Sequence, residues 1–149
     1  MKSLDNYQDW DCSFYHLGAK GSPETKPFDF SKEEFFVRGT LFALNDPRTL
    51  SAFAHWVSLF GKELDAIKIE SYLKTLPFDS AWLGYYLDLI NNEKFKVIYK
   101  YAKARIELEI LHKVKTPDEV LLKWNIYSKP LSETPQKYLH LDKSKNRVF

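Results

Sequence analysis

The sequence predicts an all-α fold: a single domain of about six helices in an orthogonal bundle, with irregular N- and C-terminal arms. Apolar residues make up 44 % of the 149 positions, which is enough for one sizeable core. They recur at helical spacing through the middle of the chain. Ser, Asp or Thr residues that can cap a helix stand before several of these apolar segments. We therefore divide the chain into an irregular arm at 1–29, a helical domain at 30–128 and a tail at 129–149.

The first two helices are predicted from their N-terminal caps. Ser31 and Glu34 have the capping-box spacing, so a helix is expected to continue to about Leu44. Asp46 suits the N-cap of the next helix, and Pro47 suits its first position, where a backbone N–H is not needed.

Three further helices are predicted from apolar periodicity. The first covers roughly Lys62–Leu76 and ends before Pro77. The second, Ala81–Ile90, is apolar nearly all round and should lie in the middle of the bundle. The third is a long helix from about Glu93 to Lys113, with apolar stripes on two sides.

A sixth helix is predicted to begin at Thr116–Glu119, where a cap, a proline and a capping-box glutamate occur together, and to end near Tyr127. The residues after it include two prolines and the basic segment Lys143–Arg147, and we interpret them as a second irregular arm. The only convincing strand alternation falls in this arm, at Lys137–Leu141.

The composition also indicates the cellular compartment of the protein. It contains one cysteine, and its first residues lack the apolar stretch of a signal peptide. No run approaches the roughly 18 apolar residues that a membrane helix needs. The formal net charge of +2 predicts neither nucleic-acid nor membrane binding from bulk electrostatics. We expect a cytoplasmic protein that does not associate with membranes.

Cys12 and His16 form the only Cys-x-x-x-His pair of the chain. Structural zinc sites need about four ligands and usually show two such pairs. Because the second pair is missing, we expect no metal site and no other cofactor, and a buried, inert thiol at Cys12.

Four aromatic residues surround this pair: Tyr7, Trp10, Phe14 and Tyr15. Large rings are good anchors, because each buries much apolar surface. They are expected to pack either on this protein's own bundle or in a groove of a partner, and we take them as candidate partner-binding residues.

A second constellation is the stretch Arg105-Ile106-Glu107-Leu108-Glu109-Ile110-Leu111-His112. On one helix, Arg105 and His112 are about two turns apart and face the same way. The spacing resembles the motif of HEPN ribonucleases, compact all-helical domains that pair two such motifs across a dimer to cleave RNA. The resemblance implies that Arg105 and His112 are catalytic, although Ile106 stands where that family usually has a polar residue. Alternatively, Glu109 pairs with Arg105 on a solvated helix face.

Nucleic-acid binding without catalysis is a third possibility. Lys96, Lys100 and Lys103 are expected to share one face of the long helix, and clustered positive charge is what phosphate contacts require. The segments Asn45–Leu50 and Trp82–Leu89 also look somewhat like the helical C-terminal part of abortive-infection antitoxins. A helix-turn-helix DNA-binding motif is not expected. Its second helix would be Ala81–Ile90, which contains no Lys or Arg to donate hydrogen bonds to base edges.

The common catalytic motifs do not occur: there is no phosphate-binding Gly-Lys-Ser/Thr loop, no nucleophile elbow and no zinc-protease helix. The sequence therefore favours a non-enzymatic interaction or assembly subunit that docks on a protein through aromatic and basic arms. A HEPN-like ribonuclease and a nucleic-acid-binding or antitoxin-like accessory protein are the alternatives.

Overall fold

Helices α2 (Lys32–Phe42) and α3 (Pro47–Phe60) begin at the caps that the sequence predicts. The Ser31 hydroxyl accepts a hydrogen bond of 3.0 Å from the Glu34 backbone, and Asp46 accepts one of 2.9 Å from the Thr49 backbone. The capping box is incomplete, because the Glu34 carboxylate does not return to the Ser31 backbone and instead pairs with Arg38 at 2.9 Å.

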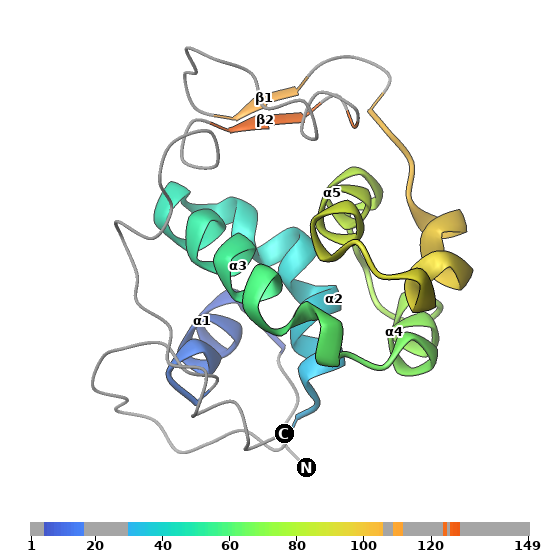
Figure 1. Cartoon of the computed structure of the whole chain (residues 1–149). Helices are drawn as coiled ribbons and strands as arrows, with labels where there is room; N and C mark the ends of the chain where they lie inside the picture. Colours follow the sequence, from blue (N-terminus) through green and yellow to red (C-terminus); the bar gives the residue numbers. More distant parts are fainter. Residues whose placement is uncertain (1–4, 17–29, 106–108, 112–123, 125, 129–149) are drawn as a thin grey trace.

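The computed structural model describes residues 5–16, 30–105, 109–111, 124 and 126–128, and helices dominate them (Figure 1). This confirms the all-α fold class, with the helices gathered around one core in a compact domain. The remaining elements are the 3-10 helices η1 (Ala43–Asn45), η2 (Gly61–Glu63) and η3 (Glu93–Tyr101), the helices α1 (Tyr7–His16), α4 (Ala66–Leu73) and α5 (Ser80–Ile90), and the strands β1 (Glu109–Leu111) and β2 (Ile126–Ser128). No helix among the described residues is both long enough and apolar enough to span a bilayer.

The core is built largely from aromatic rings, which accounts for the high aromatic content of the chain. Phe53 of α3 stacks on Trp56 with centroids 5.9 Å apart and meets Tyr86 of α5 edge-on at 4.9 Å. Gly39 of α2 faces the same ring: a Cβ there would lie 2.2 Å from a Phe53 ring carbon. The absence of a side chain at Gly39 therefore lets α2 and α3 approach closely.

Helix α1 forms where the sequence analysis expects an irregular arm. Trp10 of this helix is fully buried, stacks on Phe35 with centroids 4.8 Å apart, and donates from Nε1 to the Phe35 carbonyl at 2.9 Å. A helix this short is marginal alone and is stabilised by tertiary packing, which a local reading cannot detect. Residues 17–29 and 129–149 lie outside the described part of the chain, so the division into arms and domain stays a prediction.

The predicted long helix over 93–113 is wrong. The chain forms the 9-residue 3-10 helix η3, and Ala102 after it is extended, with φ −84° and ψ 138°. The backbone then bonds to other elements: the Lys103 N–H donates to the Ser80 carbonyl at 3.2 Å, and the Arg105 N–H donates to the Trp124 carbonyl at 3.0 Å. These tertiary bonds replace the intrahelical ones that would continue a helix.

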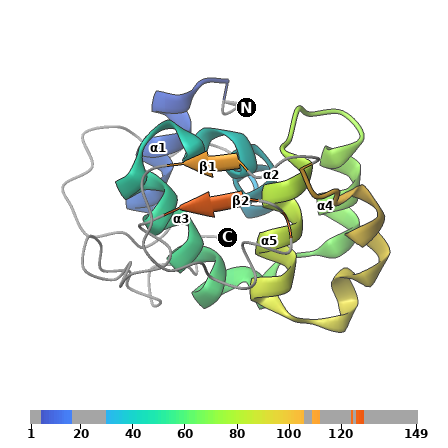
Figure 2. The same ribbon diagram turned by 90° about the horizontal axis from the view of Figure 1, so that it is seen from above.

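The strands β1 and β2 form a parallel pair in which Ile110 lies opposite Tyr127. The predicted end of the sixth helix near Tyr127 is therefore wrong, because Tyr127 belongs to a strand. Most of that predicted helix lies outside the described residues. In Figure 2 the strand pair lies across the helices at α3 and α5. The fully buried Ile126 side chain joins β2 to the helical core.

Candidate functional site

Helix η3 presents three faces, because a 3-10 helix has about three residues per turn and side chains three apart point the same way. We name each face by what it meets. The core face carries Phe95, Ile98 and Tyr101, the α5 face carries Glu93, Lys96 and Tyr99, and the α4 face carries Lys94, Val97 and Lys100. Phe95 and Ile98 are buried, which holds η3 in place beside α4 and α5 (Figure 1).

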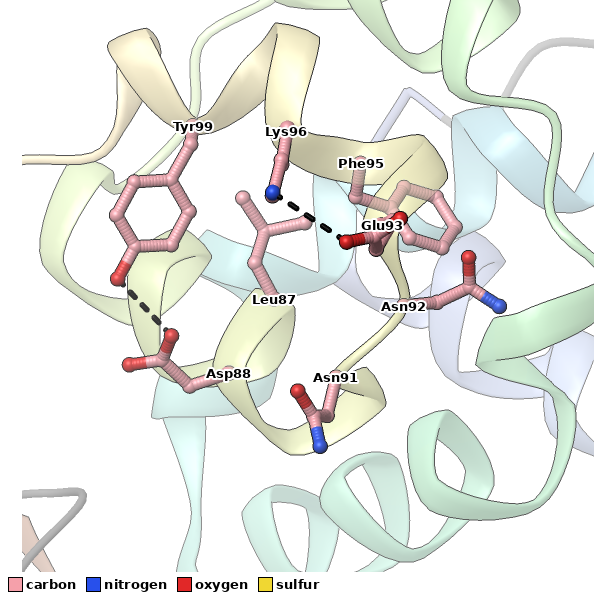
Figure 3. Close-up of a pocket in the computed structure, with 8 residues that line it drawn as sticks. All are labelled: Leu87, Asp88, Asn91, Asn92, Glu93, Phe95, Lys96 and Tyr99. Atoms are coloured by element: carbon pink, nitrogen blue, oxygen red, sulfur yellow. Dashed lines mark hydrogen bonds and ion pairs between the residues drawn. The ribbon is translucent and has the colours of Figure 1, made fainter.

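The α5 face of η3 closes one side of a pocket of about 260 Å³ (Figure 3). Its other side is the C-terminal end of α5, where Asn91 adopts a left-handed conformation with φ 50° and ends the helix. The pocket is lined by Leu87, Asp88, Asn91, Asn92, Glu93, Phe95, Lys96 and Tyr99.

Asp88 is the best-positioned polar group of this pocket. Its Oδ1 accepts a hydrogen bond of 2.9 Å from the Tyr99 hydroxyl, and its Oδ2 accepts one of 2.8 Å from Trp124 Nε1. At the mouth, Lys96 Nζ lies 3.4 Å from Glu93 Oε1, and both side chains are well exposed. Exposed pairs of this kind are weak, about 0–1 kcal/mol. The pocket can hold a small polar molecule, but it brings together no nucleophile and base.

The α4 face of η3 is fastened at one end to η2 and at the other to α4. Lys94 Nζ donates to the Lys62 carbonyl, and Lys100 Nζ lies 3.2 Å from Glu70 Oε2. Glu70 also accepts a hydrogen bond of 3.0 Å from the Tyr101 hydroxyl. Bonds from Lys100 and then Tyr101 lower the pKa of the Glu70 carboxyl, so it is ionised at neutral pH.

Two exposed apolar side chains lie, in sequence, between the residues that make these two attachments. Val97 lies midway between Lys94 and Lys100 on the α4 face, and Ile67 lies on α4 between Lys62 and Glu70. Ile67 is 78 % exposed and Val97 is 56 % exposed, and among the described residues they are the two large hydrophobic side chains that stand out in solvent. We call this area, with its flanking lysines, the α4–η3 surface.

The four candidate aromatic anchors have different positions. The rings of Trp10 and Phe14 pack in this protein's own core. The half-buried Tyr7 bonds through its hydroxyl to Asp46 Oδ2 at 2.7 Å and to Thr49 Oγ1 at 2.8 Å. The side chain of Tyr15 lies outside the described part. The structure therefore places the described rings of this set on the bundle itself.

Arg105 does not stand on a helix. It follows η3 and forms an ion pair with Asp79, the N-cap residue of α5, while Glu109 belongs to β1. The predicted helical pair of Arg105 with Glu109 is therefore wrong, because the helix that would bring them together ends at residue 101. His112 lies outside the described residues, and the helical spacing behind the ribonuclease resemblance is not found at Arg105.

The three lysines expected on one face are also separated. Lys96 lies on the α5 face of η3, Lys100 lies on its α4 face, and Lys103 follows the end of the helix. The cause is the helix type: residues four apart align at 3.6 residues per turn but diverge by about a third of a turn in a 3-10 helix. The shared face of one long helix on which the prediction placed them is thus not formed.

Cys12 is half-buried against the core, and the side chain of His16 is outside the described part. Among the residues that the structure places, no three His, Cys, Asp or Glu side chains are grouped as metal ligands.

The α4–η3 surface was not found by sequence reasoning. Its signal was available as the spacing of Lys94, Val97 and Lys100, which only a three-residue period reveals. Comparison of the chain with family models, curated proteins and solved structures gave no significant match.

Proposed function

We propose that this chain is a non-enzymatic helical interaction domain that binds a protein partner through the α4–η3 surface. The observation that carries the proposal is the position of Ile67 and Val97. Both side chains are exposed, although the same fold buries its other large apolar groups, wholly or partly, among the described residues. Single exposed aliphatic residues are common, but these two belong to elements that contact each other, α4 and η3, and can therefore contribute to one contact site.

The contacts around this surface also support the proposal. Lys94 attaches η3 to η2 and Lys100 attaches it to α4, at either side of Val97, so this part of the surface is held in shape before a partner arrives. A preorganised surface loses less conformational entropy on binding. The described residues supply no competing catalytic arrangement, because the pocket groups Asp88 and Tyr99 are engaged with each other and with neighbours.

Site-specific photo-cross-linking in the cell of origin tests the proposal. A photoreactive residue in place of Val97 is expected to give a discrete adduct with a protein, which mass spectrometry identifies. The same residue in place of Gln8, exposed on α1, is the matched control. The adduct from position 97 should weaken strongly when Ile67 is changed to Ser. Equal adduct patterns from positions 97 and 8, or an adduct that ignores Ile67→Ser, would overturn the proposal.

A further inference from the structure

We propose that α5 and η3 form a slot for an indole ring, bounded by Gly84, Asp88 and Tyr99, and that Trp124 is a latch that closes this slot from within the chain. The ligand of the open slot is a small molecule that carries an indole. The inference goes beyond the proposed function, because it concerns the α5 face of η3 and not the α4–η3 surface.

The floor of the slot is the backbone of α5 at Gly84. If this residue had a Cβ, the three nearest atoms would all belong to the Trp124 ring, two of them at 2.5 Å. Glycine is unfavourable in the interior of a helix, because it loses more conformational freedom on folding than other residues do. Its presence in α5 therefore has a specific use: it lets a flat ring lie directly against the helix.

The slot also recognises the polar edge of the ring. Asp88 follows Gly84 by about one helical turn, so both lie on the same face of α5. The Asp88 Oδ2 accepts a hydrogen bond of 2.8 Å from Trp124 Nε1, and its Oδ1 accepts one of 2.9 Å from the Tyr99 hydroxyl, which orients the carboxylate (Figure 3). The Tyr99 ring meets the indole edge-on, with centroids 5.6 Å apart. A charged acceptor gives a strong hydrogen bond to the ring N–H.

Burial of an indole does not by itself require such an acceptor in this protein. Trp82 of the same helix is fully buried, and its Nε1 has no hydrogen-bond partner in the described structure. The Trp124 indole is also buried, but a side-chain carboxylate is aimed at its N–H. A site built around such a hydrogen bond discriminates against a ring of the same shape that lacks the N–H.

The slot is complete without Trp124. Its walls come from residues 84–99, whereas Trp124 lies 36 residues beyond Asp88 in the chain. The buried side chains of Leu87 and Phe95 anchor the two walls in the core. These contacts, with the hydrogen bond between the walls, keep α5 and η3 together when the indole leaves.

The slot adjoins the pocket at the C-terminal end of α5. Asp88 and Tyr99 belong to both, because they line the pocket and also contact Trp124. A ligand can therefore approach the carboxylate along the pocket. A tethered group competes at an effective concentration of the order of millimolar, so Trp124 keeps the slot closed to a weak ligand in the native chain.

Free indole tests the slot in the full chain carrying Trp124→Ala. Isothermal titration calorimetry should show indole binding at a single site, and indole should raise the midpoint of thermal unfolding. The matched probe is indene, which has a CH2 group in place of the N–H. Because it leaves the Asp88 carboxylate without that donor, indene should bind about tenfold or more weakly. The wild-type chain should bind neither with comparable affinity, because Trp124 occupies the slot.

Two second-site variants assign the binding to this slot. Asp88→Ala, added to Trp124→Ala, should abolish the preference for indole over indene. Gly84→Ala, added to Trp124→Ala, should prevent binding of both, because its methyl group occupies the floor of the slot. Ala favours a helix more than Gly does, so this variant should fold at least as well. Gln8→Ala, at an exposed position on α1, is the control and should leave binding unchanged.

Gly84→Ala in the otherwise native chain tests the latch. The methyl group should expel the Trp124 ring while the helical core stays folded. Amide hydrogen exchange should then become faster at Arg105, whose N–H donates to the Trp124 carbonyl, and at 126–128, but not in α3.

Four results would overturn the inference. They are a folded Trp124→Ala chain that does not bind indole, equal binding of indole and indene, faster exchange throughout the bundle in Gly84→Ala, and loss of the folded state in Trp124→Ala. The last two would make Trp124 part of the cooperative core and not a latch. The cross-link from position 97 does not depend on any of them, so the proposed function is tested separately.

Discussion

Arg105 forms an ion pair with Asp79, and this contact fixes the chain after η3 to the N-terminal end of α5. Asp79 is buried and makes two further bonds: its Oδ1 accepts from the Trp82 backbone at 3.0 Å, and its N–H donates to Thr40 Oγ1 at 2.9 Å. The Asp79 carboxylate thus joins α5 to the segment at 102–105, and the backbone N–H of the same residue ties this junction to α2. Arg105 is held as a structural residue in this arrangement.

We predict that Asp79→Ala lowers the free energy of unfolding by about 1–2 kcal/mol through the lost N-cap alone. The lost pair with Arg105 adds to this, and Arg105→Ala should destabilise as well, because it leaves a buried carboxylate without its cation. Urea denaturation measures both. Lys103→Ala, at an exposed neighbouring position, is the control. Wild-type stability of Arg105→Ala would contradict the structural role.

Trp10→Ala is predicted to destabilise the fold strongly. The indole is fully buried and stacks on Phe35, and truncation of a buried Trp costs about 3–5 kcal/mol. Gln8→Ala on the exposed side of the same helix should change stability by less than about 0.5 kcal/mol. Thermal and urea unfolding separate these outcomes. If Trp10→Ala unfolds like the native chain, α1 does not belong to the cooperative core.

The Tyr7 hydroxyl should make stability depend on pH in the alkaline range. Burial, and then the bond to Asp46, raise the pKa of Tyr7 from 10.0 to about 12. The folded state therefore favours the protonated phenol. Its contribution is present below pH 10 and is lost as pH rises through about 12.

The measurement is the free energy of unfolding of wild type and Tyr7→Phe at pH 8, 10 and 11.5. Other buried tyrosines titrate in both proteins, so the difference between the two isolates Tyr7. Wild type should lose more stability than the variant above pH 10. Parallel curves would show that the phenol does not titrate differently in the folded protein.

The Asp46 carboxyl should make the stability of the fold depend on pH in the acidic range. Burial raises the pKa of its carboxyl, but hydrogen bonds from Thr49 and Tyr7 outweigh burial, and the pKa ends below 3.8. The stabilising contribution is therefore present above about pH 4 and is lost as pH falls below it. Asp46→Asn should flatten this part of the wild-type stability curve, measured by urea unfolding between pH 2.5 and 6.

The caps of this fold could be predicted because they are local. Ser31 and Asp46 were each predicted to start a helix, and each accepts the expected backbone hydrogen bond. The burial of α5 followed from apolar residues on all its sides. These signals are complete within a few residues of sequence.

What could not be predicted depends on partners distant in sequence. The apolar residues after Glu93 fit both a 3.6-residue and a three-residue period, and the choice is made by backbone bonds from Lys103 to Ser80 and from Arg105 to Trp124. Because the period was misread, Lys96 and Lys100 were assigned to a common face. Helix α1 was missed for the same reason, because its stability comes from Phe35 and other residues of the bundle.

Tyr86→Phe is predicted to leave stability unchanged or to raise it. The Tyr86 hydroxyl is fully buried and has no hydrogen-bond partner in the described structure, and burial raises its pKa well above the usual value. An unsatisfied buried hydroxyl costs about 1–3 kcal/mol, and Phe preserves the ring that meets Phe53. Tyr99→Phe is the contrast, because it removes the bond to Asp88 and should destabilise. Chemical denaturation measures the free energy of unfolding of both variants. A decrease of more than about 1 kcal/mol for Tyr86→Phe would show that the hydroxyl has a hydrogen-bond partner and would contradict the prediction.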